Sequence, residues 1–136
     1  MASIRKEFVV AAPADAVWTA LADFGAVHIR LAPGFVTDCR LEDDRTRIVT
    51  FANGAVAREI LVSRDDAARR LVYAIIGGRL TQHSASAQVF AASEGACRFV
   101  WLADFLPDEL ADYFDSQMEL GAKAMRETLE KAGVVG

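Results

Sequence analysis

The sequence predicts an α+β domain in which a curved, seven-stranded antiparallel sheet wraps around a long C-terminal helix. Three observations predict this class: short β-forming segments fill the middle of the chain, two short helical segments follow the first strand, and the C-terminal part has one continuous amphipathic pattern. The chain has 136 residues and no internal repeat or linker. We therefore expect a single domain over residues 1–136.

The first elements are separated by proline and acidic residues. Residues Ile4–Ala11 are rich in β-formers and end where Pro13 follows, because the residue before a proline favours an extended backbone. Pro13 suits the first position of a short helix that ends near Asp23. Asp23 is a candidate cap for a second short helix over Phe24–Leu31, which Pro33 and a glycine terminate.

Six further strands follow, and the turn signals between them are short enough to make each strand the antiparallel neighbour of the next. The separators are rich in Asp, Asn and Gly. The predicted strands are Phe35–Glu42, Arg47–Ala52, Val56–Ser63, Arg70–Ile76, Gln82–Ala92 and Arg98–Phe105.

The last segment, Pro107–Lys131, begins with proline and two acids and is expected to end at Gly133. Its apolar stripe at helical spacing comprises Leu110, Phe114, Met118, Gly121, Met125 and Leu129. Gly121 is unusual there, since glycine in a helix interior costs about 1 kcal/mol relative to alanine. Its presence indicates a close backbone approach, a bend, or space for a ligand.

Composition excludes several classes of function. The residues are 53% hydrophobic and 25% charged, the net charge is −4, and the basic residues are dispersed, which argues against a nucleic-acid partner. The N-terminus carries charges where a signal peptide needs apolar residues, and no apolar run is long enough to span a membrane. We expect a cytoplasmic protein with no transmembrane segment, in which Cys39 and Cys97 are buried free thiols.

Several motifs in order resemble one known group. The opening signature of this group is similar to Ala12-Pro13 followed by Val17-Trp18 and Asp23-Phe24. Four later motifs of this chain also resemble motifs of the group: Arg58-Glu59, Tyr73, Val100-Trp101 and Phe105-x-Pro107. The order of elements also resembles the helix-grip fold of this group, the START and polyketide cyclase/dehydrase-like superfamily (SRPBCC), which includes the birch-pollen-allergen-like proteins. The group contains lipid carriers, hormone receptors and aromatase/cyclases, so the resemblance implies a cavity under the long helix but no single function.

Two candidate polar residues of such a cavity are Glu59 and Tyr73. A short turn around residues 65–68 would place Glu59 roughly opposite Tyr73 on one face of neighbouring strands, where a partly desolvated carboxylate could act as acid, base or ligand acceptor. The alternative is an ordinary outer-face ion pair of Glu59 with Arg58, Arg69 or Arg70.

The hairpin around Glu94-Gly95 supplies a second set. Phe99, Trp101, Ala103 and Phe105 alternate on one face, and a three-residue loop would add His83, Ala85, Ala87 and Val89 to it. Aromatic rings beside small residues suit a cavity wall, although plain core packing explains them too. A two-residue turn would shift the register and turn His83 outward.

The predicted ligand-binding residues are therefore Glu59, Tyr73, His83, Phe99, Trp101, Phe114, Met118, Gly121 and Met125, of which Glu59, Tyr73 and His83 are candidates for catalysis. His28 is a weaker candidate for ligand contact. Neither histidine has a second ligand at metal-binding spacing, and no nucleotide or serine-hydrolase motif occurs, so we expect no metal and no cofactor.

The leading hypothesis is a protein that binds a hydrophobic small molecule, such as a lipid, a polyketide or an aromatic compound. The first alternative is a polyketide cyclase/dehydrase-like enzyme that uses the acid/base residues of the cavity. The second is a protein-interaction module, and a homodimer is a further hypothesis. A cavity of several hundred cubic ångströms under the last helix would favour the first two.

Overall fold

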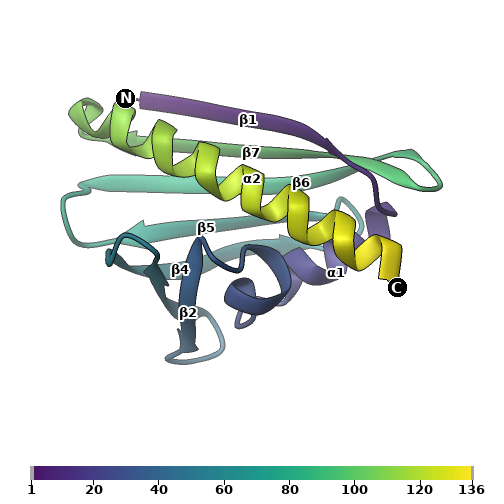
Figure 1. Cartoon of the computed structure of the whole chain (residues 1–136). Helices are drawn as coiled ribbons and strands as arrows, with labels where there is room; N and C mark the ends of the chain where they lie inside the picture. The colour runs from purple at the N-terminus through teal and green to yellow at the C-terminus, as the bar shows by residue number, and fades with distance from the viewer. Residues whose placement is uncertain (1, 136) are drawn as a thin grey trace.

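A computed structural model describes residues 2–135 and shows a long helix, α2, lying across a curved antiparallel sheet (Figure 1). The sheet has seven strands in the order β1-β7-β6-β5-β4-β3-β2. Strands β2 to β7 form the predicted meander, and β1 adds to its other edge by pairing with β7. The predicted fold class is confirmed.

The elements are β1 (Ala2–Val10), α1 (Ala14–Ala22), η1 (Val27–Leu31), β2 (Val36–Leu41), β3 (Thr46–Phe51), β4 (Val56–Asp65), β5 (Arg70–Ile76), β6 (Gln82–Ser93), β7 (Ala96–Leu106), η2 (Asp108–Leu110) and α2 (Ala111–Val135). No predicted strand boundary differs from these by more than two residues. Pro13 precedes the first helical residue of α1 instead of occupying that position.

The second predicted helix is much shorter than expected. Only Val27–Leu31 is helical, as a single π-helical turn, and no side chain caps it. Asp23 does not act as the predicted cap, because its carboxylate accepts a hydrogen bond from Arg30 at 2.8 Å. Because the helical turn begins only at Val27, with Ala26 at its cap position, Asp23 does not stand where a cap would be needed.

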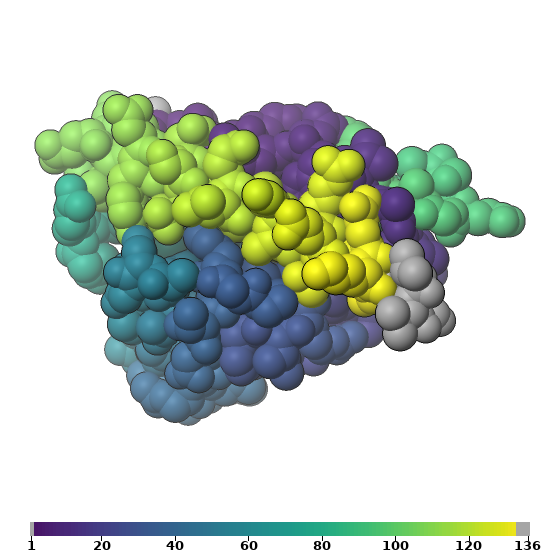
Figure 2. Space-filling model, viewed as in Figure 1, coloured from purple at the N-terminus to yellow at the C-terminus, as the bar shows by residue number. Residues whose placement is uncertain are grey.

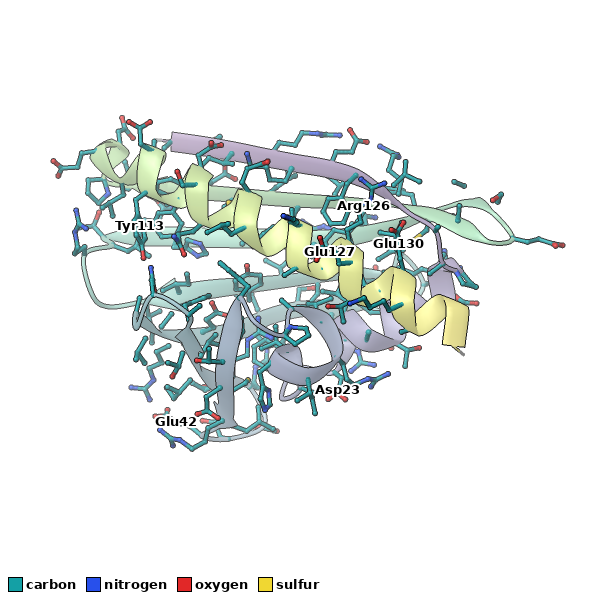
Figure 3. The ribbon with its side chains drawn as sticks, viewed as in Figure 1. Asp23, Glu42, Tyr113, Arg126, Glu127 and Glu130 are labelled. Carbon is teal, nitrogen blue, oxygen red and sulfur yellow. The ribbon has the colours of Figure 1, made fainter. Side chains whose placement is uncertain are left out.

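The long helix also differs at both ends. A 3₁₀ turn, Asp108–Leu110, precedes α2, and α2 continues through the predicted stop at Gly133 to Val135. Glycine favours a helix end without enforcing one. Near this end of α2, the Ala11 N–H donates to the Glu130 carboxylate at 2.8 Å, which joins the helix to the chain leaving β1 (Figure 3).

The core lies between α2 and the concave face of the sheet. The predicted stripe of α2 faces it, with Leu110, Met118, Met125 and Leu129 buried and Phe114 half-buried. Helix α1 and η1 close the end of the sheet near the C-terminus of α2 (Figure 1). In the space-filling view, the β6–β7 hairpin projects beyond the rest of the molecule (Figure 2).

Both cysteines are buried free thiols, as predicted. Cys97 is fully enclosed, and burial raises the pKa of both thiols. None of the helices within residues 2–135 combines the length and the apolar character that crossing a bilayer would need.

Candidate functional site

A cavity of about 100 Å³ lies beneath α2, against the concave face of the sheet. Its wall is mostly apolar and includes eight of the nine predicted binding residues, all except Gly121. These eight are Glu59, Tyr73, His83, Phe99, Trp101, Phe114, Met118 and Met125. The structure therefore brings the predicted residues together around one space, while ligand binding by them stays a prediction.

Gly121 contributes through close packing of α2 on the sheet. A Cβ atom at this position would lie 3.0 Å from Cε2 of Phe35 and 3.1 Å from Cη2 and Cζ3 of Trp101. Such distances are too short for ordinary contact, so glycine permits the helix backbone to rest on the two rings. Of the three predicted reasons for this glycine, the structure shows the close backbone approach.

Glu59 and Tyr73 lie on the same face of the sheet, but the prediction that they stand opposite each other is wrong. Glu59 pairs with Ile75, and Tyr73 pairs with Leu61. The turn occupies residues 66–69, and a one-residue bulge interrupts β4 after Leu61. The residue opposite Glu59 is therefore two positions away from Tyr73. Because side chains alternate with a period of two, Glu59 and Tyr73 still point to the same inward face.

The partner of Glu59 is Arg47, which the sequence analysis missed. The two residues are directly opposite on β3 and β4, and Glu59 Oε1 accepts from Arg47 Nε at 2.9 Å and lies 2.8 Å from Nη2. Both side chains are buried. The predicted alternative, an outer-face ion pair with an arginine at 58, 69 or 70, is therefore wrong.

Two further contacts hold the Arg47 guanidinium in place. Its Nη1 donates to the Phe24 carbonyl oxygen at 3.1 Å, and its central carbon lies 4.0 Å from the centre of the Phe24 ring. A signal for this residue was present, since the period of two places Arg47 on the same face as Val49 and Phe51. The exact loop length at Asn53 was needed to pair it with Glu59.

The Tyr73 hydroxyl sits between an indole and the cavity. Trp101 Nε1–H donates to Tyr73 Oη at 3.0 Å across the sheet. Burial raises the pKa of Tyr73 far above its ordinary value, and the nearby Glu59 carboxylate raises it further. The hydroxyl therefore keeps its proton, which has no acceptor among the described residues.

The register of the β6–β7 hairpin directs His83 inward, with Phe105 opposite. The turn has only two residues, Glu94 and Gly95, but a one-residue bulge between Ala91 and Ser93 compensates for its length. The register expected for a three-residue loop is thus confirmed, although the device that produces it differs.

A backbone amide fixes the protonation of His83. The Ile75 N–H donates to Nδ1 of His83 at 3.0 Å, just beyond the point where β5 and β6 stop pairing. Burial lowers the pKa of His83 to about 4. The imidazole is therefore neutral at pH 7, with its proton on Nε2.

Deep in the cavity, Glu59 Oε2 and His83 Nε2 have no hydrogen-bond partner among the described residues, and neither has the side-chain amide of Gln117, which also lines the cavity. Within residues 2–132, the only fully enclosed side-chain nitrogen or oxygen without a partner is Nδ1 of His28, which is not part of the cavity wall. The free atoms of Glu59 and His83 are therefore not sealed in the protein but border open space, and both residues line the cavity.

Half-buried residues mark the rim of the cavity between the start of α2 and the strand ends near it. They are Phe35, Phe51, Ile75, Phe114 and Gln117, and Trp101 deeper in the wall is also half-buried. At this rim, Asn53 Nδ2 donates to the Tyr113 hydroxyl oxygen at 3.0 Å, which links the β3–β4 turn to α2 (Figure 3). Among the described side chains, no group of three His, Cys, Asp or Glu residues could hold a metal ion.

Comparisons with known proteins agree with this geometry. The family model described as polyketide cyclase/dehydrase and lipid transport matches residues 1–132. A protein of Thermobifida fusca with a solution NMR structure is 31% identical, with a TM-score of 0.78 over 96% of this chain and 91% of that one. No curated protein matches the chain.

Two more distant structures share the fold. An uncharacterised protein of Bacillus thuringiensis is 20% identical, with a TM-score of 0.83 over 94% of this chain and 98% of that one. Norcoclaurine synthase of Thalictrum flavum, in complex with dopamine and hydroxybenzaldehyde, is 20% identical, with a TM-score of 0.74 over 96% of this chain and 87% of its own.

Proposed function

We propose a ligand-binding function from one premise: the chain belongs to the polyketide cyclase/dehydrase and lipid transport family. The ligand is a small, largely apolar molecule held between α2 and the sheet. One observation carries the proposal, namely that an apolar cavity is bordered by polar atoms without partners, Glu59 Oε2 and His83 Nε2. Since buried polar groups are normally hydrogen-bonded, such atoms favour an occupant that supplies the missing bonds.

The size of the cavity favours a compact ligand. Its volume of about 100 Å³ is below the roughly 300–1,000 Å³ of pockets for drug-sized molecules. An apolar cavity of about 150 Å³ in another protein takes up benzene. The cavity therefore holds at most a ligand of about one aromatic ring, and anything larger, such as a long lipid or polyketide, requires the rim to open. Met118 and Met125 in the wall are adaptable side chains that ease such repacking.

An enzyme of the cyclase/dehydrase type is the second candidate, because three titratable residues, Glu59, Tyr73 and His83, line one cavity. Efficient proton transfer needs a pKa near the working pH. Burial moves the pKa of Tyr73 up and that of His83 down to about 4, so both are poorly matched to neutral pH. Binding is therefore favoured over catalysis, and the interaction module stays a prediction.

The test uses the two indole N–H signals of the protein in ¹⁵N-labelled NMR spectra. Trp101 lines the cavity, whereas the Trp18 indole donates to Asp66 outside its wall and serves as an internal control. Titration with fluorobenzene is expected to shift the Trp101 signal in a saturable manner and to leave the Trp18 signal in place.

A cavity-filling variant provides the matched comparison. Ala87→Leu adds volume at a buried wall residue, while Ala92→Leu makes the same change at an exposed position on the same strand. We expect the first to abolish the fluorobenzene response and the second to retain it. Absence of any saturable response in the unmodified protein contradicts the proposal.

A further inference from the structure

The polar groups on β5 and β6 are both held as hydrogen-bond donors, and this decides what kind of ligand they recognise. Resting on the proposed function, we infer that the cavity selects a neutral, ring-sized ligand bearing a carbonyl oxygen, which accepts hydrogen bonds from Tyr73 and His83. The inference follows from what each group is already bonded to.

His83 has one nitrogen left to offer. Its Nδ1 accepts the Ile75 backbone N–H at 3.0 Å, and a backbone N–H cannot become an acceptor. The neutral ring must therefore carry its proton on Nε2. Because Nε2 has no partner, His83 presents a donor, and only a donor, to the cavity.

Tyr73 is also held as a donor, because its hydroxyl oxygen accepts from a neighbouring donor. The Trp101 indole N–H is also a donor only, and it takes a lone pair of Tyr73 Oη at 3.0 Å. The phenolic proton has no acceptor within the described residues. The hydrogen bond that Tyr73 can still form is therefore one in which its hydroxyl donates.

The two donors lie on one part of the wall. Tyr73 pairs with Ala85, and His83 follows two positions along the same face of β6, with ring centres 6.0 Å apart. Phe114 packs on the other side of His83 with ring centres at 5.9 Å. Hydrogen bonds formed in such apolar surroundings are strengthened electrostatically. A carbonyl oxygen has two lone pairs and no proton, so it matches a wall with two donors.

Charge favours a neutral carbonyl over a carboxylate. Arg47 is the one cation in the described wall of the cavity, and its guanidinium is already bonded to Glu59 and to the Phe24 carbonyl. The remaining oxygen of Glu59, Oε2, would face an anionic ligand without compensation. A ligand carboxylate that lost its hydration on entering the cavity would find no free positive partner there.

The test compares acetophenone with 2-phenylpropene, which has nearly the same shape but a C=CH₂ group in place of C=O. With one or two hydrogen bonds gained, acetophenone is expected to bind roughly three- to thirtyfold more tightly. Benzoate is expected to bind more weakly than acetophenone. Affinities are read from the saturable shift of the Trp101 indole signal.

Tyr73→Phe tests the donor directly. It should reduce the preference for acetophenone about two- to tenfold and leave 2-phenylpropene binding nearly unchanged. Tyr113→Phe, which removes an exposed hydroxyl on the rim, is the matched control and should keep the preference. A second measurement uses the unmodified protein and so does not depend on a variant that folds. The infrared carbonyl band of bound acetophenone should lie at lower frequency than that of acetophenone in hexane.

The outcomes separate the two proposals. If acetophenone and 2-phenylpropene bind equally, the carbonyl inference is overturned and ligand binding is left intact. The same holds if benzoate binds as tightly as acetophenone. An unshifted carbonyl band also overturns the inference. Failure of all three probes and of fluorobenzene to bind overturns the proposed function itself.

Discussion

The cavity wall contains two polar clusters that differ in charge and in how fully they are bonded. On β3 and β4, Arg47 and Glu59 form a buried ion pair that also engages the Phe24 carbonyl. On β5 to β7, the neutral side chains of Tyr73, Trp101 and His83 form a second cluster. Trp101 donates to Tyr73, and the Tyr73 hydroxyl and His83 Nε2 remain as unused donors. The first cluster neutralises its charges within the protein and leaves one acceptor, Glu59 Oε2, without a partner, whereas the second leaves two donors for a ligand.

The difference assigns a separate role to each side of the wall. Breaking a buried ion pair leaves a desolvated charge, so Arg47 and Glu59 are expected to control stability. Neutral donors cost less to leave unpaired and can exchange partners. The second cluster is therefore expected to control selectivity, with a smaller effect on folding.

The largest effect is expected from Glu59→Leu, which leaves the Arg47 guanidinium buried without its carboxylate. The free energy of unfolding should fall by roughly 3–5 kcal/mol, measured by urea denaturation. The control is the double variant Arg47→Met with Glu59→Leu, which removes both charges and should recover much of the loss. Equal destabilisation of the single and double variants would show that the pair does not act as a unit.

The next effect is the pH dependence due to His83. The folded pKa of about 4 lies below the ordinary value of 6.5, so between these values the unfolded chain binds a proton that the folded protein excludes. Stability from this residue is fully present above pH 6.5 and falls as the pH drops towards 4, by roughly 3 kcal/mol in the limit.

Urea denaturation from pH 7 to pH 4.5 measures this slope. His83→Leu lowers stability at pH 7, because the Ile75 N–H loses its acceptor, but it should flatten the dependence. His28→Gln, which leaves His83 intact, should retain it. The same slope in the His83→Leu protein would assign the dependence to other groups.

The smallest effect concerns the contact between α2 and the second cluster. Gly121→Ala should be destabilising by about 1 kcal/mol, since overpacking against Trp101 and Phe35 costs about 1–3 kcal/mol and the gain in helix propensity offsets about 1. In a Trp101→Leu background, where only the Phe35 contact remains, the same substitution should be less destabilising. Calorimetric melting of the four proteins measures the coupling, and simple additivity would argue against the contact.

The faces of the strands were more predictable than their partners. The sequence placed Glu59 and Tyr73 on one face of the sheet correctly, because alternation along a strand is a local property. It left open whether that face, and the side chain of His83, points into the cavity, and the structure shows that both do. It failed on the pairing of Glu59, since a bulge in β4 and the position of the next turn set the offset. For His83, a bulge and a two-residue turn combined to give the inward one of the two registers that the sequence left open.

The partners of charged residues were the least predictable feature. Arg47 was overlooked although its strand position indicated an inward side chain, and Asp23 bonds to Arg30 rather than capping a helix. A side chain selects its partner from everything within reach in space. Sequence spacing shows only the candidates that are near along the chain.

By itself, the sequence determined the order of the elements, the antiparallel meander, the apolar stripe of α2 and which side chains of a strand share a face. These features follow from backbone preferences and hydrophobic periodicity, which act over a few residues. Only the tertiary structure decided that Arg47 neutralises Glu59, that Ile75 and Trp101 turn His83 and Tyr73 into donors, and that the cavity measures about 100 Å³. These depend on register and packing between distant segments, where a single bulged residue changes which groups meet.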